Sequence, residues 1–69
     1  MGERFDERVI QFLTIARGSL MELETHLIVG HNLKFLTQDE LSVASKAIEE
    51  TGKMLNGLLG ALRSRQKAA

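Results

Sequence analysis

The sequence predicts an all-α protein, an antiparallel helical hairpin that dimerises into a four-helix bundle. Three observations support this fold class: the chain has no proline, two long segments repeat apolar residues every three or four positions, and one short segment separates them. That segment, residues 31–37, has room only for a tight connection between antiparallel neighbours. We therefore expect one domain over residues 1–69, with helices at about 6–32 and about 38–65.

The first expected helix carries a broad apolar stripe that steps by three or four residues. Its members are Phe5, Val9, Phe12, Ala16, Leu20, Leu23, Leu27, Gly30 and Leu33. Ile10, Leu13 and Ile15 widen the stripe beyond what one partner helix covers, so we expect contact with at least two neighbours. Asp6 is the expected N-cap, and a frayed first turn from Glu3 to Glu7 is the alternative.

The second expected helix has a more regular seam with the heptad spacing of a coiled coil. Its members are Leu41, Ala44, Ile48, Thr51, Leu55, Leu58 and Leu62. Thr37, followed three positions later by Glu40, forms a capping-box motif at the start. The cations Arg63, Arg65 and Lys67 near the end suit the negative pole of the helix dipole.

Length and composition favour association of two chains. A chain of 69 residues buries only about 60% of its unfolded surface, which makes its stability marginal. The absence of cysteine excludes disulfides and cysteine-based zinc sites, which leaves a second subunit as the remaining support. We expect a homodimer, with a higher oligomer as the alternative. The charged N-terminal stretch has no signal-peptide core and the longest apolar run, residues 27–29, cannot span a bilayer, so we expect a cytoplasmic protein without a membrane partner.

A patch of small residues interrupts the first helix. Gly18 costs a helix about 1 kcal/mol relative to alanine, and a close approach by another backbone would explain it. Ala16 and Ser19 extend the patch, which is the expected crossing point between helices. We therefore predict that the residues of the oligomer interface are Phe12, Ala16, Gly18, Ser19, Leu20, Leu23, Leu27, Leu55, Leu58 and Leu62.

Three runs of the chain carry a family resemblance: FLTIARGSLMELETHL, a loop that ends in FLT, and KMLNGLLGALR. Together they resemble the bacterial four-helix-bundle proteins encoded within intervening sequences of 23S ribosomal RNA genes. The resemblance extends from about Val9 to Arg63. Its most specific motif is Ala-x-Gly-Ser-Leu-x-Glu-Leu-Glu-Thr, because helical periodicity alone does not require that spacing. It implies a four-helix bundle of which this chain supplies only the C-terminal helical pair, since members of that family carry a further N-terminal pair.

That family resembles in turn the accessory protein of diversity-generating retroelements, which forms ring-like pentamers and meets nucleic acid and a reverse transcriptase. One position departs from the family pattern: Lys34 stands where the family tends to have glycine after the first helix. Because the left-handed conformation after a helix C-terminus is less favourable for lysine than for glycine, we expect either that Asn32 takes this position or that the helix ends differently.

The sequence shows no pattern typical of an active site, and we expect a protein that is not an enzyme and has no metal or cofactor. The residues three before His26 and His31 are Leu23 and Ile28, which does not fit the Glu-x-x-His pattern of helical di-iron sites. No glycine-rich phosphate loop follows a strand, and the GxSxG motif does not occur.

We therefore expect a non-catalytic helical assembly or adaptor module with an unknown protein partner. The alternative is an oligomeric bundle that binds RNA or DNA through Arg63, Arg65 and Lys67. Residues 1–34 hold five acids and four bases and residues 35–69 hold four acids and five bases, an asymmetry too small to direct nucleic acid. A third alternative is a fragment or decayed copy without an independent task.

Overall fold

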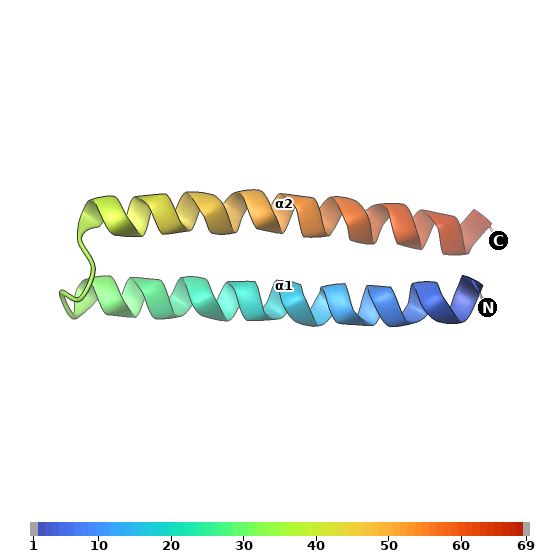
Figure 1. Ribbon diagram of the computed structural model, residues 1–69, viewed down its shortest axis with the longest axis horizontal. Helices are drawn as coiled ribbons and strands as arrows, with labels where there is room; N and C mark the ends of the chain where they lie inside the picture. Colours follow the sequence, from blue (N-terminus) through green and yellow to red (C-terminus); the bar gives the residue numbers. More distant parts are fainter. Residues whose placement is uncertain (1, 69) are drawn as a thin grey trace.

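The computed structural model describes the backbone of residues 2–68 and the side chains of residues 6–67. It consists of two helices, α1 (Gly2–Asn32) and α2 (Gln38–Ala68), which lie antiparallel and place both chain ends at the same end of the molecule (Figure 1). The described residues contain no strand, and 92% of the structure is helical. The predicted all-α hairpin is therefore confirmed, with Cα extents of 50 × 15 × 13 Å.

The start of α1 differs from the sequence-based expectation for Asp6. Asp6 is not the N-cap, because α1 begins at Gly2 and Asp6 lies inside it. Its side chain is buried and accepts hydrogen bonds from Arg65 on α2. Asp6, which the sequence placed at the start of the helix, therefore joins α1 to α2. Phe5, which belongs to the expected stripe, lies outside the described side chains.

The end of α1 is a Schellman motif built around Lys34. The Phe35 N–H donates to the Gly30 carbonyl and the Lys34 N–H donates to the His31 carbonyl, both at 2.9 Å. Lys34 itself has a φ of 67°. Both alternatives to a left-handed lysine, including the one that used Asn32, were wrong. The backbone hydrogen bonds of the motif hold the lysine where glycine would be less strained.

The start of α2 is the predicted capping box. The Thr37 N–H donates to Glu40 Oε1 at 2.9 Å, and the Glu40 N–H donates to Thr37 Oγ1 at 3.1 Å. Two backbone donors that the first turn of a helix leaves without partners are thereby satisfied. The cap fixes where the chain turns from the loop into α2.

The two helices pack along one seam, whose α2 side is rotated relative to the predicted one. Leu59 is the one fully buried side chain among the described residues, at 1% exposure. Thr51 and Leu58, which the heptad pattern placed in the seam, are exposed. Leu58 and Leu59 are adjacent, so apolar periodicity alone fits either of two phases. The seam residues of α2 are Leu41, Ser45, Ile48, Gly52, Leu55, Leu59, Leu62 and Gln66.

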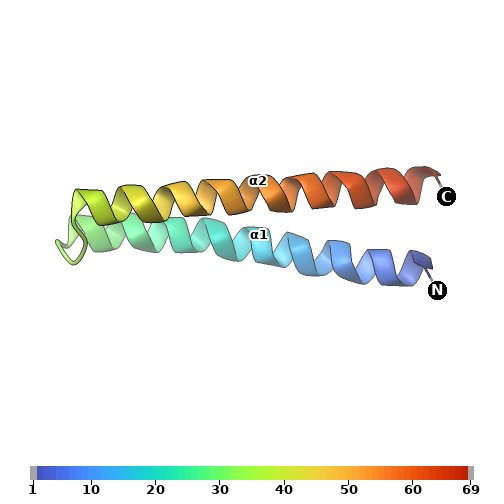
Figure 2. The same cartoon turned by 45° about the horizontal axis from the view of Figure 1, so that its top comes forward.

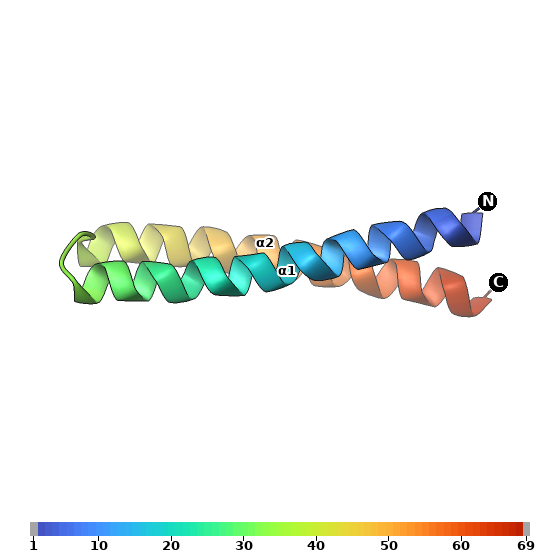
Figure 3. The ribbon, with the colours of Figure 1, turned by 90° about the horizontal axis from the view of Figure 1, so that it is seen from below.

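The seam residues of α1 are apolar or small and lie half-buried. They are Val9, Leu13, Ala16, Leu20 and Leu27. The helices stay side by side over their whole length (Figure 2), and in a third view they cross at a shallow angle near their middles (Figure 3).

Three contacts set the register between the helices. Asp6 lies level with Arg65 and Arg17 lies level with Asn56, because each pair is hydrogen-bonded. A Cβ atom placed on Gly52 would lie 3.8 Å from Leu20 Cδ2, so these two residues are also level. Residues 18–52 therefore form the loop half of the hairpin, and residues 2–17 and 53–68 form its open half.

Candidate assembly interface

Large apolar side chains lie on the surface of the hairpin. On α1, Phe12 is 69% exposed and Ile15 is 63% exposed, and on α2, Met54 is 68% exposed and Leu58 is 51% exposed. Single exposed apolar residues are common on proteins, but a contiguous group marks a surface for binding or association. The question is whether these residues share one face.

Helical geometry places them on the same side. In a hairpin, a twofold axis perpendicular to the plane of the two helices relates each helix to its antiparallel neighbour. Residues that directly precede seam positions therefore lie on the same side of that plane in both helices. Four residues at such positions are ionisable, and they flank the others along the helices: Arg8, His26, Glu40 and Arg65. The others on α1 are Phe12, Ile15 and Ser19, with Leu23 beside them, and those on α2 are Ala44, Ala47, Thr51, Met54, Leu58 and Ala61. We call these ten residues the apolar face.

Thr51 does not make the apolar face polar. Its hydroxyl donates to the carbonyl of Ala47 at 2.8 Å, within its own helix. The hydroxyl is therefore satisfied without water, and burial under another surface would leave no unpaired donor.

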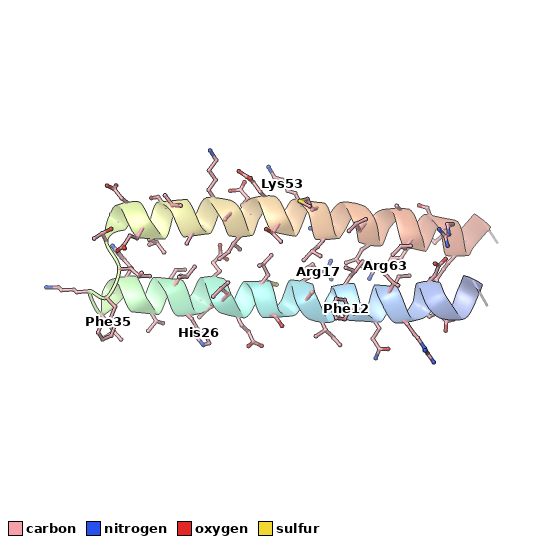
Figure 4. The ribbon with its side chains drawn as sticks, in the orientation of Figure 1. Phe12, Arg17, His26, Phe35, Lys53 and Arg63 are labelled. Atoms are coloured by element: carbon pink, nitrogen blue, oxygen red, sulfur yellow. The ribbon has the colours of Figure 1, made fainter. Side chains whose placement is uncertain are left out.

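In the part of α2 whose side chains the structure describes, the opposite side carries no apolar side chain. It is formed by the residues that directly follow the seam positions: Ser42, Lys46, Glu49, Lys53, Asn56, Gly60, Arg63 and Lys67. Figure 4 shows Lys53 pointing away from α1. The contrast between the two sides of one helix is that of an amphipathic element with an apolar side left uncovered.

A groove of about 410 Å³ runs over the α1 part of the apolar face. Ser19 contributes the one polar side chain of its lining, and the lining is formed by Phe12, Ile15, Ala16, Ser19, Leu20 and Leu23. Gly18 does not belong to this lining, and a Cβ atom added there would meet nothing within 4 Å. The small residue inside the groove is therefore Ser19.

Arg17 lies on the polar side, where it joins the two helices. Its Nη1 donates to Asn56 Oδ1 at 2.9 Å, and Figure 4 shows the side chain directed from α1 toward α2. A second groove of about 420 Å³ lies here, with Arg17, Glu24 and Glu49 in its lining. Within the described side chains, neither Glu22 nor Glu24 forms an ion pair.

Nothing in the described part of the chain has the geometry of a metal site. No group of three His, Asp or Glu side chains there could hold a metal ion. His26 lies on the outer edge of α1, away from α2 (Figure 4). Neither helix, over its described residues, has the length and apolar content that a membrane crossing requires.

Charge is segregated along the long axis of the hairpin. In the loop half, six acids (Glu22, Glu24, Asp39, Glu40, Glu49 and Glu50) outnumber Lys34 and Lys46, which gives a net charge of −4. In the open half the seven bases are Arg4, Arg8, Arg17, Lys53, Arg63, Arg65 and Lys67. The acids in this half are three, Glu3, Asp6 and Glu7, which gives a net charge of +4. A count of charges over residues 1–34 and 35–69 does not show this asymmetry, because each of these halves of the sequence runs from one end of the hairpin to the other.

Residues 1–57 match the family model described as 23S rRNA-intervening sequence protein. The chain belongs to the 23S rRNA-intervening sequence protein family. The predicted family is thus confirmed, and it is a family of small helical proteins not known as enzymes. No curated protein and no solved structure shows a significant match to the chain.

The part of the chain that matches the family model contains the whole of α1, the loop and α2 as far as Gly57. The groove over α1 lies within the match. Leu58 and the three C-terminal cations lie beyond it. The family match therefore covers most of the hairpin and eight of the ten residues of the apolar face.

The predicted interface residues of this family member fall into two groups. Exposed on the apolar face are Phe12, Ser19, Leu23 and Leu58, and half-buried in the seam are Ala16, Leu20, Leu27, Leu55 and Leu62. Gly18 is exposed outside both groups. Their role between chains stays a prediction.

The predicted nucleic-acid contacts also divide. Arg63 and Lys67 are exposed, whereas Arg65 is bonded to Asp6. Sequence reasoning missed this ion pair because its members are 59 positions apart and no local pattern connects them.

Proposed function

We propose that this chain is a non-catalytic assembly or adaptor module of the cytoplasm whose working form is a homodimer. Two hairpins cover each other's apolar faces and form a four-helix bundle. One observation carries the proposal: the hairpin has a continuous apolar face on both helices, while Leu59 alone among the described apolar side chains is fully buried. Burial of the exposed side chains on that face supplies the stability that the single seam lacks.

The side of the hairpin that carries the apolar face is large enough for a dimer interface. That side is 50 Å long and 15 Å wide, on the order of 750 Å², and the apolar face occupies its middle part. Stable interfaces bury about 800 Å² per partner. A closed ring would require two complementary surfaces on each hairpin. The side opposite the apolar face is polar on α2, and on α1 it exposes two large apolar side chains, Met21 and Ile28, fewer than the apolar face exposes. The homodimer is therefore favoured over the higher oligomer.

The family supports the same arrangement. The resemblance to four-helix-bundle proteins implies that a helical pair of this kind is covered by a second pair. A second copy of the hairpin supplies that second pair here, and the outer surface of the completed bundle remains available to a protein partner.

Sedimentation equilibrium at micromolar concentration tests the dimer. We expect the mass of two chains and a melting temperature that rises with protein concentration, because folding and association are coupled. The double variant Met54→Gln with Leu58→Gln removes two large apolar side chains from the face, and we expect the dimer to dissociate at least ten-fold more readily. The matched control, Lys53→Gln with Ser64→Gln, places the same residue type at exposed positions of α2 outside the apolar face and should leave the dimer intact. A compact folded monomer at these concentrations would refute the proposal.

The charge of the open half favours nucleic-acid binding as a second candidate function. Its net charge is +4, and Arg63 and Lys67 are exposed there. Such contacts to phosphate weaken steeply with added salt because counterions are released on binding. Arg65 is less suited to this role, since its guanidinium already bonds Asp6.

A pair of double variants tests the second candidate. Arg63→Ala with Lys67→Ala should lower affinity for single-stranded RNA and reduce its salt dependence, whereas Lys34→Ala with Lys46→Ala removes the same charge from the loop half and should not. Equal effects of the two variants, or no RNA binding at low salt, would exclude the open half as a nucleic-acid site.

A further inference from the structure

We infer that the second copy docks head to tail, so that the loop end of each hairpin lies beside the open end of the other. This inference rests on the proposed homodimer and adds its polarity and register. A second copy of this chain covers the apolar face. The two copies are related by a twofold axis that lies parallel to the face and perpendicular to the helices. That axis stacks α1 on α1 and α2 on α2, each antiparallel to its counterpart.

The charge distribution favours this polarity. Each hairpin is −4 in its loop half and +4 in its open half. Head to tail, each basic half lies against an acidic half, whereas head to head would place like charges together at both ends. The electrostatic energies of the two arrangements differ because the docked surfaces lie within a Debye length of each other, about 8 Å at physiological ionic strength.

Two charged residues at the ends of the apolar face fit the same arrangement. Glu40 and Arg65 directly precede seam positions of α2, and they lie at nearly equal distances from Gly52 in opposite directions. A twofold axis near Gly52 therefore brings Arg65 of one copy to Glu40 of the other.

Both residues keep atoms for this contact. Arg65 uses Nε and Nη2 for Asp6, and Glu40 uses Oε1 for its cap. Arg65 Nη1 and Glu40 Oε2 take no part in these bonds, so they can form an ion pair across the interface.

The apolar residues also fit together across the same axis. On α2 the axis places Ala47 against Leu58 and Thr51 against Met54, which joins a smaller side chain to a larger one in each case. On α1, Leu20 lies level with Gly52, so the axis passes close to Ser19. The α1 helices then approach each other at a serine in the centre of the groove.

The opposite polarity produces a repulsive contact. Head to head, the axis would run along the hairpin and place α1 of one copy over α2 of the other. Arg8 lies on the same side as the apolar face, within about one helical turn of the level of Arg65. The arginines of the two copies would then face each other at the open end.

Distances between spin labels in the full chain test the inference. The chain has no cysteine, so Ser64→Cys and Lys53→Cys each accept one label, both at exposed positions outside the apolar face. Head to tail, the two labels at Ser64 are separated along the axis by about 35 Å, at 1.5 Å per residue. Labels at Lys53, beside the axis, have almost no axial separation and serve as the control. We therefore expect a clearly longer distance from Ser64 than from Lys53.

Equal distances from the two positions would overturn the head-to-tail inference and leave the dimer standing. The absence of any intermolecular distance, together with a monomeric mass, would instead overturn the proposed dimer. Labelled variants are first checked for unchanged mass by sedimentation, so that loss of association through labelling is detected separately.

Discussion

Arg65 holds Asp6 at the open end of the hairpin through two side-by-side hydrogen bonds. Arg65 Nη2 donates to Asp6 Oδ1 at 2.8 Å, and Nε donates to Oδ2 at 3.1 Å. The Asp6 side chain is 7% exposed, whereas that of Arg65 is 65% exposed. The pair therefore joins a buried carboxylate on α1 to a guanidinium that still reaches water, and it fixes the ends of the two helices relative to each other.

Removal of either partner should have unequal effects on stability. Arg65→Ala leaves a buried carboxylate without its charged donor and should lower the free energy of unfolding by about 2 kcal/mol, since loss of one partner strands the other. Asp6→Ala leaves only an arginine that water can solvate and should cost less. Urea unfolding followed by circular dichroism at one fixed protein concentration compares the two. Equal losses would mean that the carboxylate is not effectively buried in solution.

Glycine at position 34 should stabilise the hairpin. Lys34 has a φ of 67°, a conformation that costs a residue with a Cβ atom about 1 kcal/mol and costs glycine little. Lys34→Gly should therefore raise the free energy of unfolding by about 1 kcal/mol. The matched control is Lys53→Gly, which removes a lysine from inside α2 and should lower it by a similar amount. The prediction fails if both variants lose stability.

The sequence was sufficient where the physical cause is local. The capping box at Thr37 depends on residues three positions apart, and it is present as predicted. The prediction that Asp6 is the N-cap of α1 was wrong, because its hydrogen-bond partner, Arg65, comes from the far end of the chain. The α2 seam was assigned to Leu58 because two adjacent leucines satisfy the same periodicity, and only the packing against α1 selects Leu59. The segregation of charge could not be predicted from the sequence, because it depends on which residues of α1 lie level with which residues of α2.

Leu58 and Leu59 should separate association from folding. Leu59 is 1% exposed, and Leu59→Ala should destabilise the hairpin by about 2–4 kcal/mol, because the lost transfer energy adds to the cavity left behind. Leu58 is 51% exposed on the apolar face, so Leu58→Ala should leave helicity nearly unchanged at high concentration and weaken the dimer. Circular dichroism over a dilution series measures both quantities. A Leu58→Ala variant that loses helicity at all concentrations equally would show that Leu58 serves the hairpin itself.

A leucine at position 19 should disrupt the dimer more than one at position 18. Ser19 lines the groove over α1 and lies beside the inferred twofold axis, so Ser19→Leu fills the space through which two α1 helices approach. Gly18→Leu adds the same side chain one position away, outside the lining and with no atom within 4 Å of its Cβ. Sedimentation equilibrium should show a larger rise in the dissociation constant for Ser19→Leu. The reverse order would move the crossing point to Gly18, where the sequence first placed it.

Charge reversal at two positions on the polar side of α2 should change the dimer in opposite directions. Arg63→Glu lowers the charge of the basic open half, while Lys46→Glu makes the acidic loop half more acidic, and both variants change the net charge of the chain equally. In a head-to-tail dimer the first variant weakens the attraction between opposite halves, so its dissociation constant should rise several-fold at low salt. The second variant strengthens that attraction, so its constant should fall. Both differences should shrink in high salt because mobile ions screen exposed charges. Tighter association of Arg63→Glu and weaker association of Lys46→Glu would instead fit hairpins that dock with their loops together.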